Sequence, residues 1–292
     1  MPPGFGGNNV LTVAFVICYV VFQISGTLAN TLFIGKVYHR FEELASTNLT
    51  VAALLAGTRG VQGTAKSRPP EGTVVRADSQ SDGRGQFGST WESAASQNLT
   101  LSILLYPNWL EINAQFYLSM TVALAVLDTA KQCLPPAAAG LISTKWPNDL
   151  YLGDRKAGGI LIQNALSGSS WGSSIVGVGL NVNQVAFPPT VARATSLAAV
   201  AGQIFDLDVV ADRLFECVER RYLQLKSGKK AEIQQEYEQQ LYRRNVPTSF
   251  RRPTGETFQG IIQGIQPDGR LCIKTNCGLE TFDLKAVALI HS

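Results

Sequence analysis

The chain has 292 residues, 45% hydrophobic and 16% charged, so it carries enough apolar material for one large domain or for one medium and one small domain. Its net charge of +3 is too small to indicate nucleic acid or an anionic membrane as the main partner. Five scattered cysteines without zinc-ligand spacing, and only two histidines, are interpreted as the reduced side chains of a cytoplasmic protein without a metal site.

The first feature in chain order is the apolar segment VLTVAFVICYVVFQI at residues 10–24, with no charged residue before Lys36. A spanning helix needs about 20 apolar residues, and a signal peptide has a basic start that is missing here. Three interpretations remain open: a membrane anchor, a signal-like segment, or an extension outside the folded unit, such as one that results from a start codon placed too far upstream. We favour an extension at residues 1–31, and expect a protein that starts near Thr31 to be soluble and fully active.

The next segments alternate between strand and helix patterns. Periodicity and turn signals predict a strand running into a turn or short helix at 32–44, a helix at 46–60, strands at 72–80 and 98–107, and a mostly buried helix at 115–133. Three strand segments follow, namely LISTKWPNDLYL, GGILIQNAL and SSIVGVGLNVN. Residues 196–242 are helical in pattern, with a polar break at 226–230.

The composition changes near Asn245. Residues 246–292 show short strand runs separated by the turn signals PTGE, QPDGR and TNCGL, which is typical of a small β-barrel. The order of strand, helix, several consecutive strands and then helices favours an α+β fold over a doubly wound parallel sheet. We therefore expect two folded units, at 32–245 and 246–292.

The stretch SDGRGQFGSTW at residues 81–91 places three glycines around Arg84 and closes with Trp91. Glycines at this spacing indicate that the backbone approaches something closely or takes a positive φ. The arginine indicates that the neighbour is anionic. A surface loop with an incidental arginine is the alternative.

The stretch STKWPNDLYLGDRKAGGIL at residues 143–161 places Lys145 before Trp146 and Pro147. The proline restricts Trp146 to extended geometry, and Asn148 and Asp149 favour a turn. Lys145 would then be held at a strand end and point at one place. The alternative is a solvated surface lysine beside a core tryptophan.

In IVGVGLNVN, residues 175–183, Gly177 and Gly179 face the same side of an apolar strand. The absence of two side chains clears a slot in which a ligand can lie against the backbone. Close packing of a neighbouring helix is the alternative.

Taken together and in order, these stretches resemble the biotin protein ligases, enzymes that attach biotin to carboxylase carrier proteins. The resemblance rests on STN at 46–48, SQSDGRGQFGSTW at 79–91, KWPNDLYL with RKAGGIL at 145–161, and GVGLNVN at 177–183. GRG alone is a weak signal, whereas KWPND followed by K-x-G-G-I-L and G-x-G-x-N is strong. The resemblance covers residues 32–292, which is why the segment before it is interpreted as an extension.

The resemblance implies a class II synthetase-like catalytic domain at 32–245, with a mixed β-sheet and flanking helices, and an SH3-like β-barrel at 246–292. It also implies a two-step reaction. Biotin and ATP, with Mg²⁺ on the nucleotide, form biotinyl-5′-AMP, and a lysine of a biotin carboxyl carrier protein then takes the biotin. Charge neutralisation in a site that excludes water is what the first step needs.

The resemblance assigns individual residues to both substrates. On the biotin side it implies recognition of the ureido ring by three polar residues and a floor made by two glycines; the set is Ser46, Thr47, Asn48, Gln80, Gly83, Arg84, Gly85, Lys145, Gly177 and Gly179. On the side of ATP and the adenylate the set is Arg84, Gln86, Trp91, Lys145, Lys156 and Asn181. Lys145 and Arg84 are expected to be the catalytic cations, with the glycines letting the loop close.

Two departures from the family pattern stand out. Many members read G-R-G-R in the loop, whereas Gln86 stands at the place of the second arginine. We expect a loop that holds the adenylate with less electrostatic help unless another cation compensates. The segment before Leu32 is apolar and uncharged, so it is not expected to be the DNA-binding domain of the ligases that also repress genes.

Two other functions remain as alternatives. A lipoate-type ligase of the same superfamily would carry an R-R-x-S-G-G-G-type loop, which the chain lacks. A biotin-binding protein without turnover would not need a cation at the phosphate. We expect no nucleic-acid or membrane partner, while a homodimer is possible in this family.

Overall fold

The computed structural model describes residues 29–57, 68–168 and 170–290. The apolar segment 10–24 lies outside these residues. Within them, no helix combines the length and the apolar character that crossing a membrane requires.

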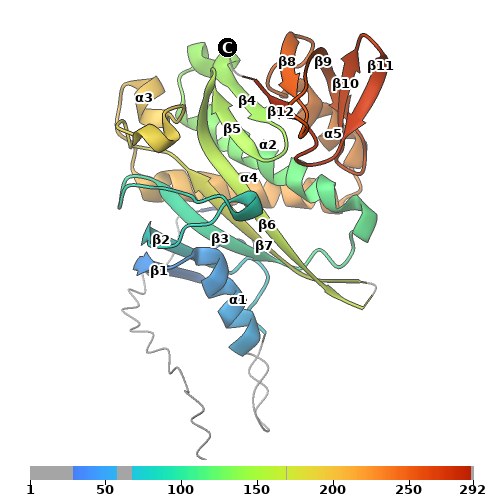
Figure 1. Ribbon diagram of the computed structural model, residues 1–292. Coiled ribbons are helices and arrows are strands. Elements are labelled where there is room, and N and C mark those ends of the chain that lie inside the picture. The colour runs from blue at the N-terminus through green and yellow to red at the C-terminus, as the bar shows by residue number, and fades with distance from the viewer. Residues whose placement is uncertain (1–28, 58–67, 169, 291–292) are drawn as a thin grey trace, which may run out of the picture.

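The larger of two sheets has seven strands in the order β1-β2-β3-β7-β6-β5-β4 (Figure 1). Only the pair of β1 and β2 is parallel, and the other neighbours are antiparallel, so the sheet is mixed. Its strands are β1 (Tyr38–Leu44), β2 (Val74–Gln80), β3 (Leu99–Leu105), β4 (Ile142–Lys145), β5 (Asp149–Leu152), β6 (Arg155–Ser167) and β7 (Ser170–Leu180).

Helices cover both faces of this sheet. Alternate residues of a strand point to opposite faces, so Val74 and Val75 enter different clusters of the core. Val75 packs with Val51 of the helix α1, whereas Val74 faces the cluster that holds the two long helices, which lie behind the sheet in Figure 1. The helices are α1 (Thr47–Gly57), α2 (Gln115–Cys133), α3 (Leu197–Ala201), α4 (Leu207–Lys226) and α5 (Lys230–Gln239).

Two details differ from the sequence prediction. Residues 32–37 form turns and the strand begins only at Tyr38, since Gly35 takes a positive φ of 78°. The segment LISTKWPNDLYL is a hairpin of two short strands, β4 and β5, because Trp146, Pro147 and Asn148 turn the chain between them. Lys145 therefore stands at the last position of β4, directly before the turn.

The second sheet is built from the C-terminal residues and is antiparallel, in the order β11-β10-β9-β8-β12. Its strands are β8 (Pro247–Arg251), β9 (Thr257–Ile265), β10 (Leu271–Thr275), β11 (Gly278–Phe282) and β12 (Ala288–Leu289). We call residues 246–290 the C-terminal unit. Figure 1 shows it beside β4 and β5, and its buried residues join the main core. The predicted α+β class with a separate β unit is confirmed.

Two carboxylates attach the chain before β1 to α4: Glu216 accepts a hydrogen bond from the backbone N–H of Asn30, and Glu219 makes the larger contact. Glu219 accepts hydrogen bonds from the backbone N–H groups of Leu32, Phe33 and Ile34, at 2.6, 2.8 and 3.0 Å. Ala29, two residues before Thr31, is 4% exposed and belongs to the core. Ala29, Asn30 and Thr31 therefore contact the folded unit, although the sequence analysis assigned residues 1–31 to an extension.

Candidate active site

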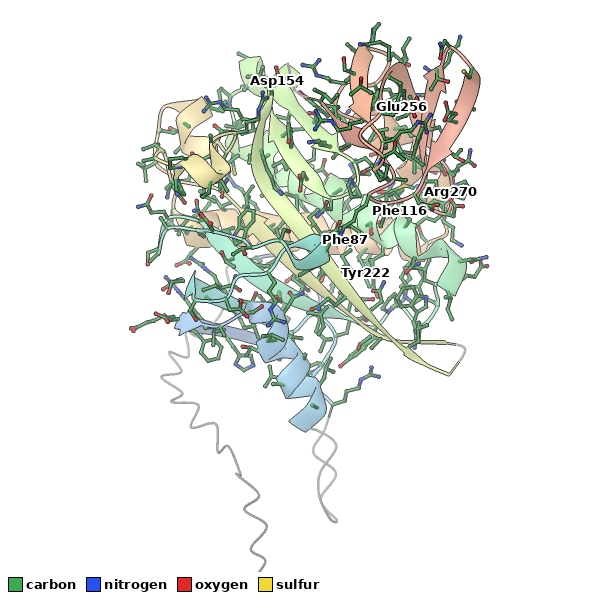
Figure 2. The ribbon with its side chains drawn as sticks, in the orientation of Figure 1. Phe87, Phe116, Asp154, Tyr222, Glu256 and Arg270 are labelled. Carbon is green, nitrogen blue, oxygen red and sulfur yellow. The ribbon has the colours of Figure 1, made fainter. Side chains whose placement is uncertain are left out.

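We call residues 81–91 the glycine-rich loop. The main cavity of the described residues lies where the large sheet, this loop and the C-terminal unit meet, and it has a volume of about 520 Å³. Phe87 of the loop lies over the sheet and below the C-terminal unit (Figure 2). The lining contains four cations, Lys145, Lys156, Arg84 and Lys285. Asp149 is the only carboxylate that lines the cavity among the residues described. The cavity therefore suits an anionic ligand of moderate size.

A buried polar cluster at the start of α1 contributes to the lining of the cavity. Ser46, Thr47 and Asn48 are 3–4% exposed and line it. The backbone N–H of Thr47 donates to Oε1 of Gln80 at 2.8 Å, and Nδ2 of Asn48 donates to Gln163 at 2.8 Å. Buried donors and acceptors that are held this firmly can read the shape and polarity of a ligand.

The glycine-rich loop closes on itself as a narrow hairpin. The N–H of Trp91 donates to the carbonyl of Gly83 at 2.9 Å, and the N–H of Gly85 donates to that of Ser89 at 2.7 Å. A Cβ at either glycine would overlap the opposite side of the loop. Both glycines thus serve the closure of the loop itself, and Gly85 lines the cavity while Gly83 does not.

Arg84 forms an ion pair within the glycine-rich loop. Its guanidinium pairs with Asp82 at 2.8 Å, and both side chains are about half exposed or more. An exposed pair of this kind contributes only about 0–1 kcal/mol, so exchanging Asp82 for a ligand phosphate costs little. Arg84 still lines the cavity.

Gly177 and Gly179 lie on β7 and line the cavity, as the sequence analysis expected of a ligand slot. In the structure the places of their missing side chains are taken by protein atoms. A Cβ at Gly177 would overlap Oδ1 of Asn48, and one at Gly179 would overlap the indole of Trp91. The slot therefore holds the indole of Trp91 against Gly179, and the indole N–H of Trp91 is buried without a partner.

Lys145 is half-buried at the end of β4 and reaches toward β5. Its Nζ donates to the hydroxyl of Tyr151 at 3.0 Å and lies 5.0 Å from the centre of that ring. Burial lowers the pKa of the Lys145 amine, nearby Asp149 raises it, and Lys156 and Arg193 lower it further. A cation with a reduced hydration shell is well suited to neutralise charge that develops beside it.

Of the other three predicted adenylate residues, two line the cavity and one does not. Lys156 lines the cavity and pairs with Asp149 at 2.7 Å. Asn181 does not line the cavity; it is 3% exposed, and its Nδ2 donates to the carbonyl of Thr195 at 3.0 Å. Asn181 thus contacts the segment that follows β7, at Thr195, and does not face the cavity. Gln86 lines the cavity, and its Oε1 is buried without a hydrogen-bond partner.

Sequence reasoning missed four residues that the structure adds to this site. The hydroxyl oxygen of Ser102 lies 2.7 Å from Oγ1 of Thr47 and 2.6 Å from Oδ1 of Asn48. Its only signal was a polar residue in the apolar strand LTLSILL. Gln163 and Tyr151 hold Asn48 and Lys145, and Lys285 comes from the C-terminal unit. No sequence pattern predicted Lys285 as a site residue, because its position depends on how the C-terminal unit packs against the rest of the chain.

Comparison with known families agrees with this fold and site. The family described as the biotin/lipoate A/B protein ligases matches residues 58–181, and the one described as the biotin protein ligase C-terminal domain matches residues 245–283. The solved biotin protein ligase of Aquifex aeolicus, in complex with biotin and ATP, has the same fold with a TM-score of 0.70 and 24% identity, covering 88% of this chain and all of that one. The molecule is a protein ligase of the biotin and lipoate class.

Two relatives that match most of this chain show which family within this class it belongs to. The biotin–[acetyl-CoA-carboxylase] ligase of Mycobacterium tuberculosis is 30% identical over 260 residues, which is 88% of this chain and 91% of that protein. The bifunctional ligase/repressor BirA of Bacillus subtilis is 32% identical over 249 residues, 84% of this chain and 70% of that protein. The chain belongs to the biotin protein ligase family.

Proposed function

We propose that this chain is an ATP-dependent biotin ligase that forms biotinyl-5′-AMP and transfers the biotin to a lysine of a carboxylase carrier protein. The observation that carries the proposal is the cavity itself. It joins a buried polar cluster at the start of α1 to a zone lined by Lys145, Lys156, Arg84 and Lys285. The neutral polar ring of biotin suits the polar cluster, and the biotin carboxylate and the triphosphate of ATP suit the zone of cations.

In the first step an oxygen of the biotin carboxylate attacks the α-phosphorus of ATP, and the bond to the β-phosphate breaks to release pyrophosphate. Both reactants are anions, so cations must offset their repulsion. Lys145 stands nearest this junction in the proposal, with its ammonium held on Tyr151. Arg84 leaves Asp82 to join the phosphate, and Gln86 offers its unpartnered amide oxygen to a donor of the ligand.

In the second step the neutral amine of the carrier lysine attacks the acyl carbon, and AMP leaves with the bonding electrons. Mg²⁺ supplies neutralisation of the phosphate charge when it arrives with the nucleotide. The described residues fit a metal brought by the nucleotide better than a resident one. Asp149 alone contributes a carboxylate to the cavity and it is paired with Lys156, while no cluster of three metal-binding side chains occurs in the described ranges.

The polar cluster at 46–48 is proposed to recognise the ureido ring of biotin. Thr47 and Asn48 supply a hydroxyl and an amide, and Gln80, Ser102 and Gln163 fix their orientation. The named relatives are biotin ligases, which favours biotin over lipoate. The four cations favour an enzyme over a binding protein without turnover.

The domain boundaries, the compartment and the oligomeric state belong to the same proposal. We propose a catalytic unit that ends near Asn245 and an N-terminal extension that ends before Ala29, since Ala29 is in the core. A protein starting at Ala29 should then retain the activity of the full chain, whereas a clear loss of activity would assign the removed segment a role.

Free Cys133, Cys217, Cys272 and Cys277 support a reducing compartment such as the cytoplasm. Sedimentation with and without biotin would detect a homodimer.

The deciding experiment uses the full chain with ATP, Mg²⁺, biotin and a biotin carboxyl carrier domain. The mass of the carrier should rise by one biotin, and Lys145→Ala should abolish the shift. Biotin binding without any shift would support the binding-protein alternative. A shift with lipoate in place of biotin would support the lipoate alternative.

A further inference from the structure

The turn that carries Lys145 is held by the C-terminal unit. Trp146, the next residue, donates its indole Nε1–H to the backbone carbonyl of Gly269 at 2.9 Å. Gly269 lies in the QPDGR turn between β9 and β10, which is 123 residues further along the chain. The contact therefore joins the hairpin of β4 and β5 to the C-terminal unit.

Gly269 is fixed at this place by its backbone geometry. Its φ of 96° lies in the region that favours glycine, and its N–H donates to the carbonyl of Gln266 at 2.8 Å to close the turn. A Cβ would overlap the ring of Phe116 at the start of α2. Phe116 and Arg270, the residue after Gly269, are both labelled in Figure 2 where the C-terminal unit meets α2. Gly269 thus packs closely against Phe116 of α2, while its carbonyl accepts the hydrogen bond from Trp146.

The rest of the hairpin turn is held from other directions. The hydroxyl of Tyr237 on α5 lies 3.4 Å from the carbonyl of Pro147, and Nδ2 of Asn148 donates to the carbonyl of Ile160 at 2.7 Å. Trp146 and Asn148 both line the cavity. The Gly269 contact reaches Trp146, the residue after Lys145, whereas backbone hydrogen bonds with Gln240 and Tyr242 hold Thr144, the residue before it.

We propose that the backbone carbonyl of Gly269 is a positioning group for the ligase reaction: by fixing the indole of Trp146, it sets where the Lys145 ammonium stands in the cavity. The proposal rests on the proposed function of Lys145. It assigns the QPDGR turn to the adenylation step, although no side chain of that turn needs to touch a substrate.

The test is Trp146→Phe, which keeps an aromatic ring and removes the N–H donor. Biotin-dependent exchange of pyrophosphate into ATP isolates the first step. The loss of one hydrogen bond should lower the exchange rate by about 3- to 10-fold. A loosened turn also admits water to Lys145, so the pH at which exchange declines on the alkaline side should move upward. The groups that face Lys145, namely Tyr151, Asp149, Lys156 and Arg193, are unchanged by the substitution.

Trp171→Phe is the matched control. Trp171 is 4% exposed, lies outside the cavity lining, and its indole N–H has no partner, so this substitution removes a buried indole without removing a hydrogen bond. It should leave the exchange rate unchanged. Gly269→Ala, which strains the turn from the other unit, should lower the rate in the same direction. The double variant should then lose less than the product of the single losses.

The outcomes separate the two proposals. No biotin-dependent exchange by the unchanged protein would contradict the proposed function. Exchange by the unchanged protein, with Trp146→Phe equally fast, would overturn the positioning role. A slower Trp146→Phe whose alkaline decline stays in place would also overturn it, because the contact would then act without changing the surroundings of Lys145.

Discussion

At the scale of single residues, the site depends on a lysine that is charged but poorly hydrated. Burial lowers the pKa of Lys145, and Tyr151 accepts a hydrogen bond from its ammonium. The proposed chemistry needs the protonated form, because only the cation offsets the charge of the carboxylate and the phosphate. The lowered pKa brings the loss of that cation closer to neutral pH.

This gives a pH prediction for the adenylation step. The rate of biotin-dependent pyrophosphate exchange should fall as the pH rises through the lowered pKa of Lys145, which is below that of an ordinary lysine. Lys145→Arg, if it retains measurable exchange, should show no such decline, since arginine stays protonated. An alkaline decline that persists in Lys145→Arg would assign the titration to another group.

Gln86 gives a second prediction at this scale. Gln86→Arg places a cation beside the bound phosphate, and a charge-assisted hydrogen bond should slow release of biotinyl-5′-AMP by about 10-fold. Gln86→Met, which has similar length and no charge, should not slow it. The release rate can be followed by chasing the labelled adenylate with excess unlabelled biotin and ATP. Equal release from Gln86→Arg and the unchanged protein would show that the departure from G-R-G-R has no electrostatic effect.

At the scale of elements, the glycine-rich loop and the C-terminal unit contact each other through two residues that line the cavity. Nζ of Lys285 lies 4.1 Å from the centre of the Phe87 ring. Both residues have positive φ, 58° for Phe87 and 66° for Lys285, which is uncommon for residues with a side chain. The contact spans the two units that line the cavity.

Removing this contact should make the loop open more often. A cation over an aromatic ring at a partly exposed site contributes about 0.5–1 kcal/mol, so amide hydrogen exchange in the loop should accelerate about 2- to 5-fold in Lys285→Met. Lys285→Arg keeps the cation and should resemble the unchanged protein. Lys274→Met removes an exposed lysine of the same unit that lies outside the cavity lining, and should have no effect. Loop exchange that is the same in Lys285→Met and Lys274→Met would contradict the contact.

Elements with a strong local pattern were predictable from sequence. The helix at 115–133 was predicted with the bounds that the structure shows, because apolar residues dominate the segment up to Cys133 and Pro135 follows. A turn after Lys145 was predicted from Asn148 and Asp149, but LISTKWPNDLYL was not divided into the strands β4 and β5, since these have only four residues each. The cluster at 46–48 and the cations Lys145, Lys156 and Arg84 do meet around one cavity. Lys285 and Gly269 could not be foreseen, because they reach the site only through packing between the two units.

At the scale of the whole molecule, Glu219 connects the beginning of the described chain to α4. Glu219→Gln keeps the shape but removes the charge that three backbone N–H groups share, and should lower the free energy of unfolding by about 1.5–3 kcal/mol in urea. Glu216→Gln is the control, because its Oε1 accepts a single backbone bond, from Asn30. If both variants lost the same free energy of unfolding, the three hydrogen bonds of Glu219 would stabilise the fold no more than the single one of Glu216.

The seat of Trp91 on Gly179 also has an optical consequence. Of the four tryptophans in the chain, Trp91 and Trp146 line the cavity, whereas Trp109 and Trp171 do not. The indole N–H of Trp91 is unpartnered, so a ligand that enters the cavity changes the polarity around it. With Trp109 and Trp171 replaced by phenylalanine, and with tryptophan excited selectively over tyrosine, the tryptophan fluorescence of the protein would come from the cavity alone. The molecule would then report its own occupancy in real time, without any label on the substrates.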